Sequence, residues 1–191
     1  MTHLDAGVLA RAEAFMEKRA AISIPLDDYR QAAVLVPLIR RSDDWSILFC
    51  QRAEDLTLHS GQISFPGGGA EEGETLEQTA LRETEEEIGV SSASIRLLGR
   101  LDDLVTVSGY VVSPFIGIMP SDAVYVLQTS EIVKTYEVPI SVLLSPGPDV
   151  RYIRFNERDY PSLFFRAQGI EIWGLTGRIL KALLDVIRVV A

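Results

Sequence analysis

The sequence GGAEEGETLEQTALRETEEEIGV, residues 68–90, decides the fold of this chain. Its second part, 75–88, contains no glycine or proline, is rich in glutamate, leucine and alanine, and is followed by Gly89. This composition predicts a helix over 75–88 that ends at the glycine. The preceding FPGGG, residues 65–69, predicts a break in regular structure, because proline and glycine interrupt helices and strands. A glycine-rich loop therefore leads directly into a helix.

Glutamate is concentrated in this segment, with eight residues of this type between 71 and 87. At about 100° per residue, Glu83, Glu86 and Glu87 share one face of the predicted helix. Like charges at this spacing repel one another, whereas Mg²⁺ prefers oxygen ligands and suits clustered carboxylates. The face is either a solvated charged surface or a divalent-cation site. Arg82 on its flank favours the site, as do the glycines at 67–69, whose backbone can offer a carbonyl ligand.

The spacing of these residues follows a known pattern. Gly68, five residues, Glu74, seven residues and the run RETEEEIGV at 82–90 resemble the Nudix box. That box reads G, five residues, E, seven residues, R-E-apolar-x-E-E-x-G-apolar, and it fixes nine positions over 23 residues. Every glycine, glutamate and arginine of the pattern is present at its spacing. Thr84 is the one departure, since an aliphatic residue is usual there, and a threonine methyl can still pack.

The Nudix resemblance implies an α/β fold, a Nudix-type α/β/α sandwich with a mixed β-sheet and a catalytic loop–helix–loop. It implies hydrolysis of a diphosphate linked to another moiety, with Mg²⁺ or Mn²⁺ as cofactor. Such ions neutralise the diphosphate and lower the pKa of a bound water. The implied metal ligands are Glu83, Glu86, Glu87 and the carbonyl of Gly67 or Gly68. The implied catalytic residues are Glu83 and Glu86, with Glu83 or a nearby carboxylate orienting the attacking water, and Arg82 and Glu74 as a supporting pair.

The segment before the box bears on the substrate. Residues 48–68 resemble the additional signature of Nudix coenzyme A diphosphatases, whose G-x-x-x-F-P-G-G part matches residues 61–68 in full. Thr57 stands where that signature often has an arginine, so a cation for a 3′-phosphate contact is missing there, and Arg52 or His59 is the alternative cation. The resemblance implies cleavage of coenzyme A to 3′,5′-ADP and 4′-phosphopantetheine. The expected substrate-binding residues are Arg52, His59, Gly61, Phe65 and Gly68.

The likeness to this subfamily covers about residues 29–188 and includes segments around 101–114, 131–144 and 169–176. Two roles are open for Glu131. It is either an additional acid that approaches the metal site, or a carboxylate at a helix N-terminus, which is favourable without any function. Asp102 and Asp103 are either site residues or turn formers.

The remaining pattern predicts a single domain over 1–191, in which 1–28 forms a helix and an extended lead-in and 29–191 form the core with a C-terminal helix. At 191 residues, one domain of this kind can bury a large core. Apolar runs predict a hairpin from 32–39 and 45–50. The other expected elements are a helix at 5–20, strands at 95–101, 109–118 and 132–138, a short helical piece near 139–144, a hairpin from 151–155 and 161–166, and a helix at 173–190.

Composition limits the partners. The net charge is −9, which disfavours a nucleic-acid partner and an anionic membrane surface, because both require a basic surface. The single Cys50 excludes an intramolecular disulfide framework. The absence of a signal-peptide pattern and of a long apolar run predicts a cytoplasmic protein. We expect a small-molecule diphosphate as the partner, and the amphipathic ends permit a homodimer.

Two alternatives remain open from the sequence. The first is a Nudix hydrolase acting on ADP-ribose, dinucleotides or nucleoside triphosphates. It stays open because Thr57 stands where the coenzyme A signature often has an arginine. The second is a Nudix-fold binding module without turnover. The joint presence of Glu83, Glu86 and Glu87 argues against this second alternative, because a binding module can dispense with metal carboxylates.

Overall fold

The computed structural model describes residues 6–42, 44–54, 61–155 and 157–191. None of the helices in these ranges is long and apolar enough to cross a membrane. In chain order the elements are α1 (Ala6–Lys18), β1 (Arg30–Arg41), β2 (Asp44–Arg52), β3 (Ile63–Ser64), β4 (Gly67–Gly69), α2 (Leu76–Ile88), the 3₁₀ turn η1 (Ser92–Ser94), β5 (Arg96–Arg100), β6 (Leu104–Val105), β7 (Tyr110–Met119), β8 (Ile132–Pro139), α3 (Ile140–Leu144), β9 (Asp149–Phe155), β10 (Arg158–Ala167), β11 (Ile170–Ile172) and α4 (Gly174–Val190).

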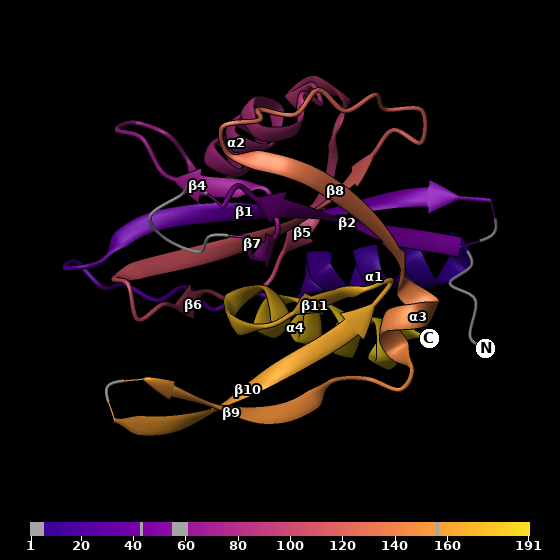
Figure 1. Cartoon of the computed structure of the whole chain (residues 1–191). Coiled ribbons are helices and arrows are strands. Elements are labelled where there is room, and N and C mark those ends of the chain that lie inside the picture. The colour runs from indigo at the N-terminus through magenta and orange to yellow at the C-terminus, as the bar shows by residue number, and fades with distance from the viewer. Residues whose placement is uncertain (1–5, 43, 55–60, 156) are drawn as a thin grey trace.

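The main sheet is mixed (Figure 1). Its principal order is β3-β2-β1-β7-β5, and β4 pairs with β1, β6 with β7 and β8 with β2. β1 and β7 run parallel, from Arg30 opposite Tyr110 to Ile39 opposite Met119, and the other pairs are antiparallel. The predicted hairpin over 32–50 is confirmed as β1–β2.

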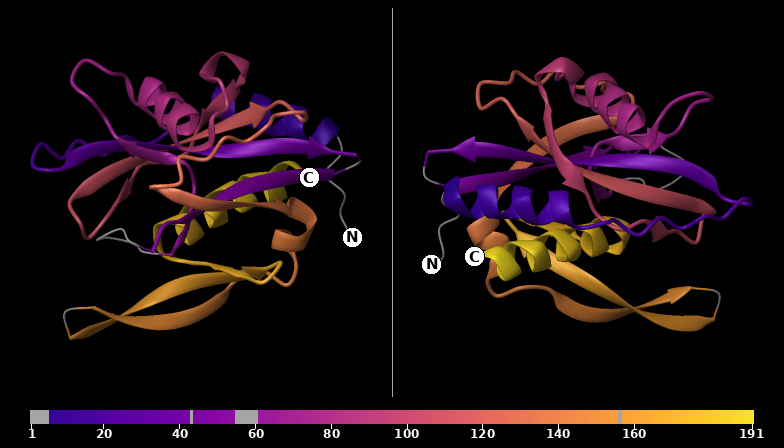
Figure 2. Two further views of the ribbon diagram at one scale, coloured as in Figure 1. Left: turned by 45° about the horizontal axis from the view of Figure 1, so that its top comes forward. Right: turned by 180° about the vertical axis from the view of Figure 1, so that it is seen from behind.

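The sheet separates two apolar cores because successive residues of a strand face opposite sides. On β1, Leu35 and Ile39 face α2, whereas Val36 and Leu38 face the layer that contains α1 and α4. All four are at most 1% exposed, and burial of each such side chain stabilises the fold by roughly 1.5–3 kcal/mol. Figure 2 shows α2 on one side of the sheet and α1 and α4 on the other. The α/β/α sandwich expected from the sequence is confirmed.

A smaller three-stranded sheet, in the order β11-β10-β9, lies beside this sandwich. Its β9–β10 hairpin projects from the body of the molecule (Figure 2). The predicted hairpin of 151–155 with 161–166 is thereby confirmed, and both strands extend beyond the predicted ends.

The glycine-rich segment departs from prediction. Residues 67–69 were expected to break regular structure, yet they form β4, which pairs with residues 32–34 of β1. Glycine has a low intrinsic preference for strands, and here the partner strand supplies the hydrogen bonds. The short strands β3, β6 and β11 were likewise not expected, because segments of two or three residues carry no detectable periodicity.

Candidate active site

The glycine strand and the acidic helix are each held by their own local contacts. β4 is paired to β1. α2 starts with a capping box, in which the Thr75 hydroxyl accepts the N–H of Gln78 and the Gln78 amide accepts the N–H of Thr75. It ends at Gly89, whose φ of 74° closes the helix in the left-handed conformation. These caps fix where α2 begins and ends.

Two glycines of β4 lie directly against two glutamates of α2. A Cβ atom on Gly68 would overlap the Glu83 carboxylate. Gly67 has a φ of 153°, and a Cβ atom there would come within 2.6 Å of the Val34 Cα. Its N–H donates to Glu87 Oε2 at 3.1 Å. The missing side chain of Gly68 therefore lets the Glu83 carboxylate approach the backbone of the loop, and the missing side chain of Gly67 lets β4 approach β1.

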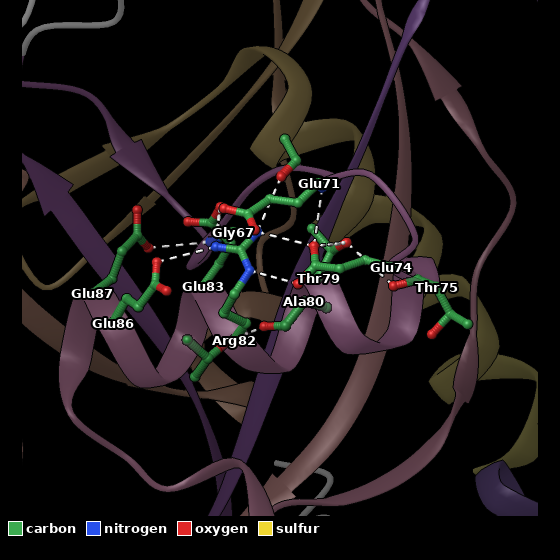
Figure 3. Close-up of polar contacts among 12 residues, drawn as sticks. Gly67, Glu71, Glu74, Thr75, Thr79, Ala80, Arg82, Glu83, Glu86 and Glu87 are labelled. Carbon is green, nitrogen blue, oxygen red and sulfur yellow. Dashed lines mark hydrogen bonds and ion pairs between the residues drawn. The ribbon is translucent and has the colours of Figure 1, made fainter.

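Arg82 joins the loop to the helix (Figure 3). Its Nε donates to Glu74 Oε1 at 2.7 Å, and its Nη2 donates to Glu74 Oε2 at 3.2 Å and to the Gly69 carbonyl at 3.1 Å. Its Nη1 donates to Glu83 Oε1 at 3.0 Å and to Glu86 Oε2 at 3.1 Å. The two-point contact with Glu74 fixes the plane of the guanidinium, as is typical of arginine–carboxylate pairs.

Thr79 is a supporting residue that the sequence did not single out. Its hydroxyl donates to Glu74 Oε2 at 3.0 Å, and the side chain is fully buried. The Glu74 carboxylate also accepts the N–H of Glu71 at 3.0 Å. Hydrogen bonds from Arg82, with those from Glu71 and Thr79, lower the pKa of Glu74 to about 2. No single-sequence pattern marks Thr79, because its partner lies outside the helix.

The three glutamates of the acidic face differ in burial. The Glu87 side chain is 3% exposed, and this burial raises its pKa to about 8. Burial also raises the pKa of Glu83, against hydrogen bonding from Arg82. Glu86 is 59% exposed. The face is therefore not a uniformly solvated charged surface, because two of its carboxylates are held away from water.

Arg52, at the end of β2, lies beside the buried Glu87 of the acidic face. Its Nη1 lies 3.7 Å from Glu87 Oε1. The Arg52 charge opposes the effect of burial on the pKa of Glu87. The next N–H along the chain, that of Ala53, donates to the Glu131 carbonyl at 2.8 Å.

Glu131 lies in a turn directly before β8, so it does not sit at a helix N-terminus. The loop that carries it is bonded to α2, because the Gln128 N–H donates to the Glu87 carbonyl at 2.9 Å. The negative charge of Glu131 acts to raise the pKa of both Glu83 and Glu87. The fold thus brings Glu131 close to the acidic face, as the first of its two open roles requires.

Comparison with known proteins decides the family. A match to the NUDIX domain covers residues 29–159. This chain belongs to the Nudix hydrolase family. The uncharacterized Nudix hydrolase NudL of Yersinia pestis (strain Pestoides F) is 36% identical over 159 residues, a stretch that covers 81% of this chain and 78% of the relative.

Solved structures support the Nudix fold. The structure of a MutT/nudix family protein from Enterococcus faecalis superposes with a TM-score of 0.55 at 16% identity, covering 94% of this chain and 70% of that one. The Nudix hydrolase RenU from M. smegmatis superposes with a TM-score of 0.51 at 18% identity, covering 59% of this chain and 72% of that one.

The expected substrate residues fall in different surroundings. Gly61 is half-buried, with a φ of 65°. Phe65 is 4% exposed and stacks on Phe49, with ring centroids 5.0 Å apart. The ring of Phe65 therefore packs in the apolar core of the Nudix sandwich, and the expected substrate-binding role of Phe65 stays a prediction. His59 and Thr57 lie outside the described residues.

Asp102 and Asp103 have structural roles. Asp102 Oδ1 accepts the N–H of Ile22 at 2.7 Å, and Asp103 Oδ2 accepts the N–H of Ile24 at 2.9 Å. Asp103 Oδ1 also accepts the Ser113 hydroxyl at 2.5 Å. These bonds attach the extended lead-in to the Nudix core.

The donor set of the Nudix helix suits a hard divalent cation. Glu83, Glu86 and Glu87 offer only carboxylate oxygens, which Mg²⁺ and Mn²⁺ prefer. Within the described ranges, no three acidic, histidine or cysteine side chains converge as a ready metal cluster. Arg82 Nη1 is bonded to both Glu83 and Glu86. The burial of the Glu87 carboxylate fits a bound cation, and the missing Gly68 side chain lets the Glu83 carboxylate lie against the backbone of the loop.

Proposed function

We propose that this Nudix hydrolase cleaves the diphosphate bond of coenzyme A, or of its derivatives, to 3′,5′-ADP and 4′-phosphopantetheine. One observation carries the proposal. The upstream segment that resembles the coenzyme A signature includes both Arg52 and the glycines of β4. Arg52 lies beside Glu87, and Gly67 and Gly68 lie against Glu87 and Glu83. A substrate bound at these carboxylates would therefore be within reach of the signature segment.

The proposed metal ligands are Glu83, Glu86, Glu87 and the carbonyl of Gly67, and the proposed ion is Mg²⁺ or Mn²⁺. When bound, the ion supplies charge neutralisation of the diphosphate and an activated water. Glu83 or Glu131 orients the attacking water by accepting a hydrogen bond at a carboxylate oxygen. Glu83 has the buried position for this role, and Glu131 brings a carboxylate from the loop before β8.

Glu74 and Arg82 support the site by holding the glycine strand and the acidic helix in place. Glu74 holds the guanidinium of Arg82 by two hydrogen bonds, and Arg82 holds the Gly69 carbonyl and the Glu83 carboxylate. The glycine strand and the helix therefore keep a fixed separation. Preorganised groups of this kind stabilise developing charge without reorganising during the reaction. We expect Arg52, whose Nη1 lies 3.7 Å from Glu87 Oε1, to contact a phosphate oxygen of the substrate.

The experiment that tests this function is product analysis. The protein is incubated with coenzyme A and Mg²⁺, beside ADP-ribose and a dinucleotide, and the products are separated by chromatography. We expect 3′,5′-ADP to appear, coenzyme A to be the fastest substrate by about tenfold or more, and a chelator to stop the reaction. Survival of coenzyme A while another diphosphate is cleaved would retain the Nudix chemistry and reject the substrate. Tight nucleotide binding without hydrolysis in the presence of metal would indicate a binding module.

A further inference from the structure

Two polar side chains on the neighbouring strands β2 and β3 lack a hydrogen-bond partner. The Nε atom of Arg52 and the hydroxyl oxygen of Ser64 are both shielded from solvent, and neither finds a partner among the described residues. A buried polar group without a partner lowers the stability of a fold, and native proteins leave few such groups. A partner that forms only when a ligand binds is one explanation for them.

Both side chains face α2. Ser64 lies directly opposite Cys50 in the β2–β3 ladder, and residues opposite each other in a ladder share a face of the sheet. Cys50 belongs to the apolar core on the α2 side. The residues before and after Ser64 belong to the core on the other side, as the alternation along a strand requires. Arg52 also faces α2, because its Nη1 lies 3.7 Å from Glu87 Oε1.

Strand register brings the two unpaired groups within reach of each other. The Arg52 N–H donates to the Gln62 carbonyl at 3.0 Å, so Ser64 lies two residues along the chain from the residue opposite Arg52. Such diagonal neighbours on one face lie about 7 Å apart, which a long side chain can span. Cys50, the ladder partner of Ser64, is close to the site: burial raises the pKa of its thiol, and the charges of Glu87 and Arg52 also act on it.

Arg52 differs from Arg82 in how its guanidinium is held. The Arg82 Nε donates to Glu74 Oε1 at 2.7 Å, which helps to fix the plane of that guanidinium. The Arg52 guanidinium lies 3.7 Å from Glu87, which is longer than a hydrogen bond, and its Nε is unpaired within the described ranges. A hydroxyl that accepts the Nε–H would fix the plane in the same way. Because a hydroxyl is neutral, the positive charge of Arg52 would remain available to a phosphate.

We propose that Ser64 is a positioning residue for Arg52. When substrate binds, the Ser64 hydroxyl accepts the Arg52 Nε–H, and the Nη atoms then face a phosphate oxygen of the diphosphate. This inference rests on the proposed function, in which Arg52 contacts that phosphate. Since both groups are unpaired in the free protein, their pairing adds a hydrogen bond on binding and breaks none. The G-x-x-x-F-P-G-G pattern over 61–68 leaves position 64 unspecified, so the motif itself gives Ser64 no role.

The test measures KM, kcat and Tm of Ser64→Ala, with coenzyme A and Mg²⁺ in the assay. We expect KM to rise about fivefold and kcat to change by less than about twofold, because one hydrogen bond to a charged group has an effect of this order on binding. Tm should not fall, since the hydroxyl has no partner to lose in the free protein. Ser64→Thr, which keeps a hydroxyl, should restore KM. Ser113→Ala is the matched control, because the buried Ser113 hydroxyl donates to Asp103. Its Tm should fall while its KM stays within about twofold.

A double variant tests whether Arg52 is the partner. Lysine keeps the positive charge of Arg52 but has no Nε–H group. In the Arg52→Lys background, Ser64→Ala should therefore change KM by less than about twofold, because the bond that it removes is already absent. An undiminished fivefold effect in that background would show that Ser64 acts on another group and would overturn the proposal. A fall in Tm of Ser64→Ala with an unchanged KM would also overturn it, by assigning Ser64 a purely structural role.

The outcomes separate this inference from the proposed function. If the wild type cleaves ADP-ribose and leaves coenzyme A intact, the proposed substrate is rejected, and the same variants are measured with ADP-ribose, which also contains a diphosphate. A rise in KM of about fivefold for Ser64→Ala, absent in the Arg52→Lys background, would then still support the pairing. No rise would reject it. If the wild type cleaves neither compound, both proposals fail.

Discussion

The Glu83 carboxylate occupies the space that a Cβ atom on Gly68 would fill. One residue further along β4, a Cβ atom on Gly69 would meet nothing within 4 Å. Two adjacent glycines of the same strand therefore differ in whether a side chain could be added without displacing a neighbour. Gly68 is required for the position of a proposed metal ligand, whereas Gly69 contributes its carbonyl to Arg82.

This contrast predicts the effects of two matched substitutions. Gly68→Ala should displace Glu83 and lower kcat on the order of 100-fold, because a misplacement of about 1 Å at a reacting centre has an effect of that size. Gly69→Ala should retain kcat within about threefold, since the added methyl group meets open space and backbone carbonyls are unchanged. Steady-state kinetics on both variants, with circular dichroism to check the fold, tests the prediction. Similar kcat values for the two variants would contradict the assigned contact.

Removal of the Glu83 charge should abolish most turnover and leave the fold intact. Glu83→Gln keeps the shape of the side chain but removes a proposed metal ligand, so we expect kcat to fall at least about 100-fold. Glu77→Gln is the control, because Glu77 is exposed in the first turn of the same helix. Its kcat should match that of the wild type. Near-normal turnover by Glu83→Gln would remove Glu83 from the mechanism.

Thr84, the departure from the Nudix box, is fully buried, and its hydroxyl donates to the Ala80 carbonyl at 2.7 Å. Such a bond back into a helix contributes little to stability, because that carbonyl already accepts a backbone bond. Thr84→Val should therefore raise the free energy of unfolding by up to about 1 kcal/mol, and Thr84→Ser should lower it by about 1 kcal/mol through the lost methyl group. Urea denaturation measures both. Destabilisation by the valine would show that the hydroxyl bond matters.

Glu137 gives a prediction for acid stability. Its carboxylate accepts two hydrogen bonds of 2.7 Å from Arg41 and one of 2.9 Å from the Tyr125 hydroxyl. The bonds from Arg41, joined by that from Tyr125, lower its pKa. A carboxylate with a lowered pKa stabilises the folded state above its unfolded pKa of about 4.3, and this contribution is lost as the pH falls through the folded pKa.

Glu137→Gln should therefore lower the free energy of unfolding by about 1–2 kcal/mol at pH 7. The difference from the wild type should shrink below about pH 4, where the wild-type carboxyl group becomes protonated. Tm values at pH 7 and at decreasing pH provide the measurement, and Glu77→Gln again controls for the change in net charge. A difference that stays constant with pH would assign the effect to packing.

Local sequence predicted the helix of the site well. The observed bounds of α2, Leu76–Ile88, follow from Thr75 as cap and Gly89 as end, because both signals act within one turn of the helix. The shared face of Glu83, Glu86 and Glu87 follows from the helical repeat alone. The Arg82–Glu74 pair was expected from the motif, and the structure brings the two side chains together.

Other features depended on distant contacts. The sequence pattern at 67–69 indicated a break, whereas pairing with β1 makes it a strand. Phe65 belongs to the motif that suggested a substrate contact, but its ring stacks on Phe49 of β2 in the core. A motif position specifies a residue type, and only the packing of separate elements decides whether that residue faces ligand or core.

The sequence by itself determined the family, the acidic helix and the glycines before it, because these are encoded by residue types at short and fixed spacing. The tertiary structure alone decided the surroundings of that helix. Glu131 approaches it because its loop bonds to the Glu87 carbonyl, and Arg52 approaches it from the end of β2. The same β2–β8 pairing places Lys134 opposite Gln51, 83 positions away in the chain. Contacts between residues so far apart follow from strand register, which no local pattern specifies.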